Sequence, residues 1–194
     1  MANDDLDRRV LTAVGAKRVV VLPTADAYEH PERLVAAAMS WGERLDVEVE
    51  ALMIMRRGEA MTDQAAAPVR AALAVYLVGD QPLHLRSVLK TTPVWDAICD
   101  VLARGGLVVA CAGSAAALCD PMVDPRGGAF TLGLGLVDDV ALVTEAEKWS
   151  GERLHRTLKL ANTAVATLPT GSALVRSSGT WELVGDVTVH GDLP

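Results

Sequence analysis

A short apolar run that passes directly into a string of small residues constrains this chain more than any other feature. Residues 107–110, LVVA, have the character of a buried strand, and residues 111–117, CAGSAAA, follow without a polar loop. A sharp turn from a strand into a helix tolerates only small neighbours, so a side chain at its tip stands clear of the sheet. Residues 104–137 therefore predict a strand, a tight turn, a helix and then a polar loop.

Apolar runs and helical segments alternate along much of the rest of the chain. The expected strands are residues 17–22, 46–55, 74–78, 107–110 and 140–144. The expected helices are residues 31–45, 62–73 (in two pieces or kinked at Pro68), 83–90, 93–105 and 149–160, the last with Ser150 as N-cap. The tail, residues 172–190, alternates apolar runs with glycine turns, which predicts antiparallel strands at the edge of the sheet. The pattern predicts an α/β three-layer sandwich around a mostly parallel, doubly wound sheet.

The composition limits the number of domains and the classes of partner that the chain can have. With 194 residues and 51% hydrophobic content the chain can bury one full core, so we expect a single domain over residues 1–194. The net charge of −7 leaves no basic face for phosphates, which argues against nucleic acid and anionic membranes as partners.

The cysteines and the N-terminal residues indicate a reduced compartment. Cys99, Cys111 and Cys119 are an odd number without C-x-x-C spacing, so neither disulfides nor a zinc site is expected, and no cofactor is implied. The first residues, MANDDLDRR, lack an apolar signal region, and no apolar run approaches the roughly 18 residues of a membrane span. We therefore expect a cytoplasmic protein.

Four blocks of the sequence resemble one known family. They are VVVLPTADAYEHPE (19–32), GDQPLHLRSVLKTTPVWDA (79–97), CDPMVDPRGGAFTLGLGLV (119–137) and WSGERLHRTLKLA (149–161). Together they resemble the cyanophycinase and aspartyl dipeptidase family of serine peptidases, over about residues 17–190. The resemblance implies a class I glutamine amidotransferase-like fold in one peptidase-like domain, and it implies that the family's first strand is missing here. Members are Ser-His-Asp/Glu hydrolases of peptides rich in aspartate.

The family's nucleophile falls in one of two registers. By motif, residues 112–117 match the small-x-Ser-Ala-Gly-Ala elbow, which makes Ser114 the nucleophile with Ala116 where glycine belongs. By spacing from both sides, Ala112 occupies the nucleophile position instead, and Ser114 then begins the next helix as an N-cap. Cys111 is a third candidate for the tip, although a buried, inert cysteine suits its surroundings better.

The family's histidine position falls on Glu145, counted from the GLGL loop toward Trp149. An ordinary carboxylate, with a pKa of about 4, accepts a serine proton near neutral pH far less well than imidazole does. His84 is the alternative base, because it lies one helical turn after the GDQP turn.

The resemblance to the family also assigns roles to the remaining candidate site residues. Asp120 best matches the triad carboxylate, and Asp124 is the second choice; either also suits a role in bracing its loop. Gly79 matches one glycine of the family's oxyanion pair, and Gln81 lies where it can contact a ligand. Arg126, in a glycine loop, is suited to bind a carboxylate through two parallel hydrogen bonds.

Three functional hypotheses follow from these residues. The leading one is a family homologue with a degraded triad and little or no hydrolase activity. The second is an active serine hydrolase of Asp-containing peptides that uses Ser114 and Asp120. The third is a protein that binds acidic peptides or amino acids in the former active-site cleft. The expected partner is a small peptide or amino acid, and a homodimer stays open because relatives of this fold often dimerise.

Overall fold

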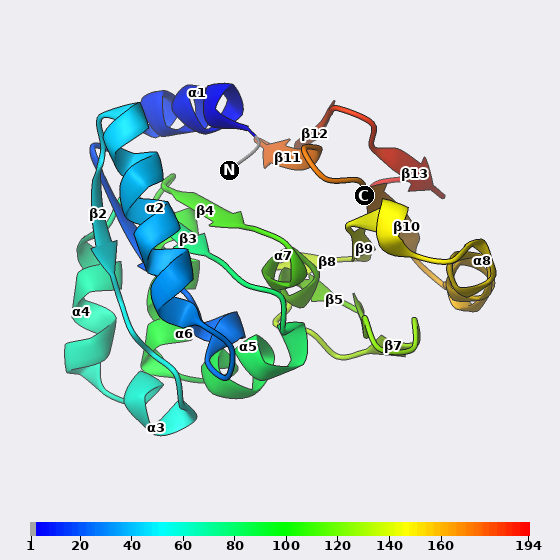
Figure 1. Ribbon diagram of the computed structural model, residues 1–194, viewed down its shortest axis with the longest axis horizontal. Helices are drawn as coiled ribbons and strands as arrows, with labels where there is room; N and C mark the ends of the chain where they lie inside the picture. The colour runs from blue at the N-terminus through cyan, green and yellow to red at the C-terminus, as the bar shows by residue number, and fades with distance from the viewer. Residues whose placement is uncertain (1–2) are drawn as a thin grey trace. The chain divides into compact units, whose positions relative to one another are not determined.

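The computed structural model describes residues 3–194, which group into two compact units of the chain, residues 3–114 and 115–194. Figure 1 traces the chain through both units. The fold is α/β with a mostly parallel central sheet, as the sequence predicts. The single domain expected over residues 1–194 and the missing first strand stay predictions, and residues 1 and 2 lie outside the described part.

The first unit is built on a four-stranded parallel sheet. Its strands are β1 (Arg18–Leu22), β2 (Glu48–Ala51), β3 (Ala74–Leu77) and β4 (Leu107–Ala110), in the order β2-β1-β3-β4. All four were expected, although β2 is shorter than the predicted range 46–55. The chain steps from β1 to β2 on one side and to β3 on the other, so the sheet is doubly wound. In such sheets ligands bind beyond the carboxyl ends of the strands where the order reverses, here between β1 and β3.

Helices cover both faces of this sheet. The helices of the first unit are α1 (Asp4–Val14), α2 (Pro31–Leu45), α3 (Arg57–Ala60), α4 (Asp63–Ala71), α5 (Pro82–Leu89) and α6 (Pro93–Ala103), with a 3-10 turn η1 (Thr24–Asp26) after β1. Val19 and Val21 of β1 share a buried cluster with Trp41 of α2, whereas Val20 faces Pro68 of α4 on the opposite side. Alternation along β1 therefore separates the two helical layers.

Of the two forms predicted for the segment of helix α4, division at Pro68 is wrong, and a kink at Pro68 stays a prediction. The helix continues through the proline, which lies inside it, instead of dividing there. A proline at this point removes one backbone donor from the helix. Ala66 and Val69 of the same helix are fully buried, so packing holds the segment helical despite that loss.

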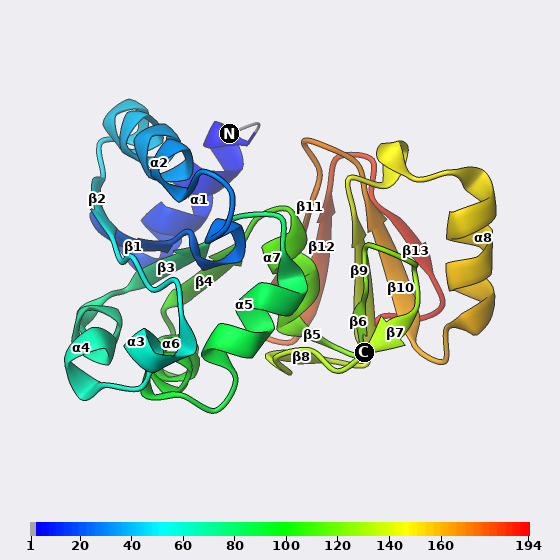
Figure 2. The same ribbon diagram turned by 60° about the horizontal axis from the view of Figure 1, so that its bottom comes forward.

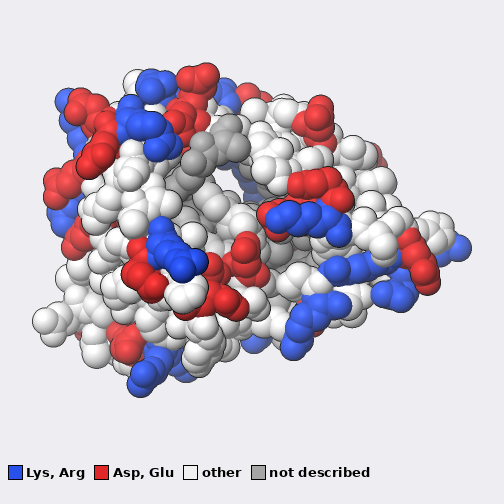
Figure 3. Space-filling model, in the orientation of Figure 1, with Lys and Arg blue, Asp and Glu red and all other residues white. Residues whose placement is uncertain are grey.

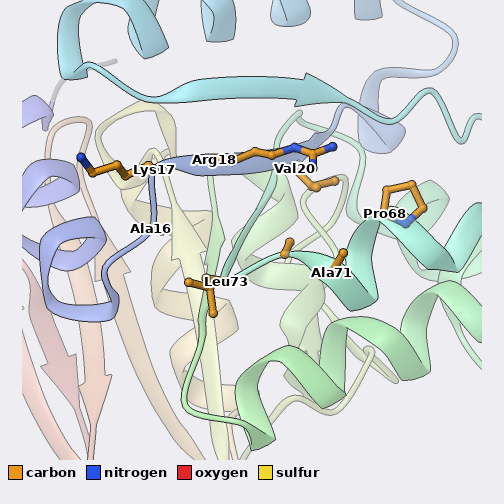
Figure 4. Close-up of a pocket in the computed structure, with 8 residues that line it drawn as sticks. Ala16, Lys17, Arg18, Val20, Pro68, Ala71 and Leu73 are labelled. Atoms are coloured by element: carbon orange, nitrogen blue, oxygen red, sulfur yellow. The ribbon is translucent and has the colours of Figure 1, made fainter.

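A hollow of about 220 Å³ lies between the start of β1 and the end of α4 (Figure 4). Its lining residues are Ala16, Lys17, Arg18, Val20, Pro68, Ala71, Ala72 and Leu73. These residues gather near the amino ends of β1 and β3. The hollow is therefore at the end of the sheet opposite to the one where ligands of doubly wound folds bind.

The second unit has a mixed three-stranded sheet. Strands β9 (Val140–Thr144) and β10 (Ala164–Leu168) are parallel, and β13 (Thr188–His190) pairs with β10 in the antiparallel direction. Helix α8 (Gly151–Leu160) packs beside this sheet (Figure 2). Its Leu154 and Leu158 contact the cluster that contains Val143 and Val165. The Ser150 hydroxyl accepts the Arg153 N–H at 3.3 Å, which confirms the expected N-cap.

Shorter elements complete the second unit. They are the pairs β5 (Cys119–Asp120) with β8 (Val137–Asp138) and β6 (Met122–Val123) with β7 (Phe130–Thr131), the 3-10 turn η2 (Ala146–Lys148), and the hairpin β11 (Ala173–Ser177) with β12 (Thr180–Val184). The tail was expected to form antiparallel strands at the edge of the sheet, and β13 confirms this prediction. The hairpin instead forms a two-stranded sheet of its own, and β10 was not expected at all.

No helix within residues 3–194 is both long enough and apolar enough to cross a lipid bilayer.

Candidate functional site

The turn that follows β4 has the backbone of an elbow. Ala112 has a φ of 56°, in the left-handed region that a residue with a Cβ rarely adopts. The strand ends at Ala110, and helix α7 (Gly113–Leu118) begins directly after the left-handed residue. The structure therefore places the tip of the turn at Ala112, where the side chain is a methyl group.

Gly113 explains why the turn needs small residues. A Cβ at this position would lie 2.3 Å from the backbone oxygen of Asp80 and 2.6 Å from its carbonyl carbon. These atoms belong to the turn after β3, so the two turns pack backbone against backbone. A side chain cannot be accommodated there without moving one of them.

Ser114 is fully buried and is bonded to the neighbouring turn. Its Oγ donates to the carbonyl oxygen of Gly79 at 3.0 Å, and its backbone N–H donates to the same oxygen at 2.9 Å. The N-cap role expected for Ser114 is wrong, because the hydroxyl donates to a carbonyl of the β3 turn rather than accepting a helix N–H. The hydroxyl ties the start of α7 to that turn.

Cys111 precedes the tip and packs against the core cluster around α1 and α2. Burial raises the pKa of its thiol to about 11, and the nearby charge of Asp7 adds to the effect. The thiol is therefore protonated at neutral pH, which agrees with the expected inert cysteine.

The turn after β3 contains a residue that the sequence did not single out. Asp26, at the end of η1, accepts the backbone N–H of Asp80 on its Oδ1 at 2.6 Å. Gly79 has a φ of 118°, and a Cβ there would lie 2.6 Å from the same carboxylate oxygen. Asp26 and this turn follow β1 and β3, so they meet where the strand order reverses. The available signal was an acidic residue four positions after the end of β1.

Gln81 and His84 lie in the same region of the first unit. Gln81 is exposed and precedes α5, and its predicted contact with a ligand stays a prediction. His84 Nε2 lies 3.0 Å from the carbonyl oxygen of Met55, and its ring meets Tyr28 edge-on at 4.8 Å. With Nε2 facing a carbonyl, that nitrogen is assigned as the one that carries the proton.

In the second unit, Asp120 and Asp124 take part in loop contacts. Asp120 Oδ1 accepts the Gly133 N–H at 3.4 Å. Asp124 accepts the backbone N–H of Arg126 at 2.9 Å and forms an ion pair with the same residue's guanidinium at 2.7 Å. Bonding to Arg126 holds the pKa of Asp124 below its usual range, and the charge on Arg153 contributes to this. Both carboxylates thus brace the segment that follows α7.

Arg126 was expected to bind a carboxylate ligand, and in the structure it already binds one from its own chain. Its Nε and Nη2 contact the two oxygens of Asp124 at 3.0 and 2.7 Å. Arg44 uses the same two nitrogens on Asp4, at 2.8 and 3.2 Å. In both of these pairs, the Nε–Nη2 edge of the guanidinium holds the carboxylate.

In Arg153, the corresponding Nε–Nη2 edge of the guanidinium makes no hydrogen bond within residues 3–194. Its guanidinium lies 3.6 Å from the centre of the Trp149 ring. Its Nε and Nη2 are buried and have no hydrogen-bond partner within residues 3–194. Lys and Arg side chains gather over α8, which carries this residue (Figure 3). The sequence analysis missed Arg153; the available signal was an arginine four residues after a tryptophan at a helix start.

Glu145, at the expected histidine position, follows β9 with a φ of 50°. Its carboxylate forms an ion pair with Lys148. The other histidines are accounted for by local positions: His30 lies beside Glu32 at 3.1 Å, and His155 and His190 are exposed. Within residues 3–194, no group of three or more His, Cys, Asp or Glu side chains is arranged to hold a metal ion.

Comparison with known proteins places these features in context. The sequence matches no known protein-family model and no curated protein. In structure it is similar to a peptidase from an acI-B1 actinobacterium, with a TM-score of 0.84 and 25% identity over 97% of this chain and 84% of that one. It is also similar in fold to a putative peptidase E protein from Listeria monocytogenes EGD-e, with a TM-score of 0.69 and 18% identity over 96% of this chain and 92% of that one. The first neighbour is a peptidase, which supports a peptidase family for this chain, whereas the second shows a shared fold.

Proposed function

We propose that this chain is a divergent homologue of the cyanophycinase and aspartyl dipeptidase family with little or no serine-triad hydrolysis. The observation that carries the proposal is the left-handed tip of the β4–α7 turn, which is occupied by Ala112. A methyl group at this position has no atom that can attack a carbonyl carbon. The similarity to a solved peptidase supports the family part of the proposal, and the similarity to a putative peptidase E protein supports the fold.

Ser114 is poorly placed to replace the missing nucleophile. A nucleophilic serine needs an exposed oxygen whose proton is passed to a base. The Ser114 side chain is fully buried, and its proton is donated to the carbonyl of Gly79, which cannot act as that base. Attack by this oxygen would require the start of α7 to move away from the β3 turn.

The position of the base supports the same proposal. Glu145 stands where the family has histidine, and its carboxylate is paired with Lys148. An ordinary carboxylate is almost fully ionised at neutral pH but is a weak base there, with a pKa of about 4 against about 6.5 for imidazole. Proton transfer from a serine to such a group is unfavourable.

Reaction with a fluorophosphonate probe tests this proposal. We expect no labelling of the wild-type chain and no hydrolysis of Asp-containing dipeptides, because neither the tip nor Ser114 offers an activated hydroxyl. The measurement is mass spectrometry of the probe-treated protein together with a dipeptide turnover assay. Labelling that disappears in Ser114→Ala but persists in Ser87→Ala, accompanied by hydrolysis, would establish an active serine enzyme and overturn the proposal.

A second function, binding of acidic peptides or amino acids, is favoured by the unbonded edge of Arg153. Two buried guanidinium nitrogens without a hydrogen-bond partner are costly, and a ligand carboxylate can satisfy Nε and Nη2 with two parallel charge-assisted hydrogen bonds. Trp149 fixes the plane of the guanidinium. Gly128 packs against both residues: a Cβ there would lie 3.4 Å from Trp149 Cζ3 and 3.6 Å from Arg153 Cγ.

Ligand titration separates this function from a purely structural role. We expect aspartate or an Asp-containing dipeptide to raise the melting temperature of the wild-type chain, and we expect Arg153→Lys to weaken binding at least tenfold. Lysine keeps the charge but loses the paired donors, which at about 1.4 kcal/mol per tenfold is within the range of one charge-assisted bond. The measurement is isothermal titration calorimetry, with Lys159→Ala on the same helix as the control. Equal affinities of Arg153→Lys and wild type would contradict the assignment.

A further inference from the structure

A hollow of about 450 Å³ lies within the second unit, at the amino ends of β9 and β10. Asp139 and Thr163 directly precede these two parallel strands, and the register pairs Val140 with Ala164, so the two lining residues are neighbours. Strand β7, which contributes two further lining residues, lies near the start of β10 in Figure 2. The hollow has the size of an ordinary small-molecule site, about 300–1,000 Å³. Its lining residues are Pro121, Phe130, Thr131, Leu132, Asp139, Asn162 and Thr163.

This hollow lies at the other end of β9 from Glu145, the expected histidine position. Asp139 precedes the strand and Glu145 follows it. At about 3.3 Å per residue, the length of β9 separates the two positions by roughly 15–20 Å. A ligand in the hollow therefore occupies a different place from one bound at the expected catalytic position.

Asp139 gives the hollow its charge. Of the described residues that line it, Asp139 alone is charged, and its carboxylate makes no ion pair or hydrogen bond within residues 3–194. The backbone of Asp139 is left-handed, with a φ of 61°, and its N–H donates to the Asp120 carbonyl oxygen at 3.3 Å. The turn thus holds an exposed carboxylate at a hollow that offers it no cationic partner. Such a site attracts a positively charged ligand.

Other polar groups suit an ammonium ion better than a metal ion. The Thr163 hydroxyl oxygen is buried and has no hydrogen-bond partner in the described part of the chain. Rotation about χ1 exchanges the hydroxyl and the methyl group of a threonine, so this oxygen can turn toward a donor in the hollow. An ammonium group brings three N–H donors, and the Asn162 amide oxygen is a further acceptor for them. A metal ion would need more ligands of the His, Cys, Asp and Glu type than residues 3–194 bring together anywhere.

The rest of the lining is apolar. Pro121 and Phe130 are partly buried, and Leu132 is 63% exposed although it stands beside the aromatic ring in the sequence region of β7. Burial of this leucine by a ligand would remove apolar surface from water. The face of a phenylalanine ring also attracts a cation within about 6 Å of its centre. The lining therefore fits a ligand with a positive head and an apolar body.

We infer that this hollow binds organic ammonium ions that carry an apolar group, with the ammonium on Asp139 and the apolar group against Phe130 and Leu132. The site is separate from the Ala112 turn and from the Arg153 carboxylate site, and its ligand carries the opposite charge to the acidic ligands proposed there. Loss of either proposed function leaves this site untouched.

Three ligands with the same aromatic body test the choice of charge. We expect phenethylamine to shift the backbone amide signals of Asp139, Asn162 and Thr163 in two-dimensional NMR, and to bind about tenfold or more tightly than phenethyl alcohol, because only the amine gives a charge-assisted hydrogen bond. Phenylacetate, which is repelled by Asp139, should not bind. Equal affinities for the amine and the alcohol, or no binding of the amine, would overturn the inference.

A pair of neighbouring aspartates tests the position of the charge. We expect Asp139→Asn to weaken phenethylamine binding about tenfold or more. Asparagine adopts the left-handed backbone readily, so this variant should keep the turn, as the dispersion of its NMR spectrum will show. Asp138→Asn removes the same charge from an exposed residue that does not line the hollow, and it should change the affinity less than about threefold. Equal weakening by the two variants would reduce the effect to general surface charge and contradict the site.

A pair of exposed leucines tests the apolar contact. Leu132→Ala should weaken phenethylamine binding about threefold or more, whereas Leu183→Ala, on β12 and outside the hollow, should leave it unchanged. Unchanged binding in Leu132→Ala would show that the amine only pairs with a surface carboxylate, and would overturn the inference.

The dipeptide amide Phe-Gly-NH2 distinguishes the two sources of such an ammonium group. Tighter binding than phenethylamine would assign the site to peptide amino termini, and weaker binding would assign it to free amines. Either result supports an ammonium site, provided that acetylation of the dipeptide amino group abolishes its binding. Binding of the acetylated dipeptide with unchanged affinity would contradict the role of Asp139.

Discussion

Gly133→Ala is expected to destabilise the protein by about 3 kcal/mol or more, the largest effect among the glycine substitutions considered. A Cβ at this position would lie 1.7 Å from the Cys119 oxygen, 2.9 Å from its carbonyl carbon and 3.1 Å from the Ala117 oxygen. All three are backbone atoms, so no side-chain rotation relieves the clash. The backbone hydrogen bond from Leu134 to Ala117 holds the two segments together at 2.8 Å. Urea unfolding measures the loss.

Gly127→Ala is the matched control in the same unit. A Cβ there would have no heavy atom within 4 Å, so its free energy of unfolding should stay within about 0.5 kcal/mol of wild type. If Gly133→Ala yields no soluble protein while Gly127→Ala folds normally, this result would also show that a Cβ at position 133 destabilises the fold. Equal stabilities of the two variants would show that the segments around Gly133 separate at little cost.

Asp7→Ala is expected to lower stability by about 2–3 kcal/mol. The Asp7 carboxyl is 8% exposed and accepts hydrogen bonds from Trp41 Nε1 and Tyr76 Oη, each at 3.0 Å. It thereby joins α1, α2 and β3. Alanine would leave both donors buried without an acceptor, and each such group costs about 1–3 kcal/mol. Asp7→Asn keeps an acceptor for Trp41 and a donor for the Tyr76 oxygen, so its loss should be smaller.

The Asp7 carboxyl also gives a pH dependence with a defined sign. Burial raises its pKa above the ordinary value of 3.8, although the bonds from Tyr76 and Trp41 oppose the shift. The native state therefore holds the proton more tightly than the unfolded chain does. The stabilisation linked to this proton is fully present below about pH 4 and is lost as the pH rises through the native pKa.

Urea unfolding of wild type and Asp7→Asn across this range checks the sign. The stability of wild type relative to Asp7→Asn should fall as the pH rises from 3.8 toward neutrality, because asparagine does not titrate. Asp100→Asn, at an exposed position, should show no such trend relative to wild type. A relative stability that rises with pH would mean that the bonds to Tyr76 and Trp41 outweigh burial.

The fold was predictable where local signals are strong. Helix α2 has the predicted bounds, because a proline at its start and apolar spacing along it specify it locally. Strand β4 was likewise predicted correctly, since its apolar run is bounded by glycine and small residues. Strand β10 was missed because only residues 161–163 separate it from helix α8, and they include neither glycine nor proline. Strands β11 and β12 pair only with each other, and this pairing depends on tertiary contacts that hydrophobic periodicity does not predict.

The site was predictable only in outline. The sequence left Ser114 and Ala112 as alternatives, and the choice depends on a backbone dihedral that composition does not determine. Asp26 lies 54 residues before the amide it accepts, so its role arises from the sheet order and not from a motif. Arg126 looked available for a ligand, yet its neighbour Asp124 binds it, whereas Arg153 is distinguished by burial that becomes visible only in three dimensions.

The left-handed backbone at Ala112 has a consequence for engineering. An L-residue in this conformation costs about 1 kcal/mol, so the shape of the turn is imposed by its surroundings, through the close approach at Gly113 and the two bonds of Ser114 to Gly79. The backbone therefore fixes the direction of the Cα–Cβ bond at position 112, whichever side chain stands there. A catalytic or reporter group introduced there would inherit a defined orientation from the existing backbone.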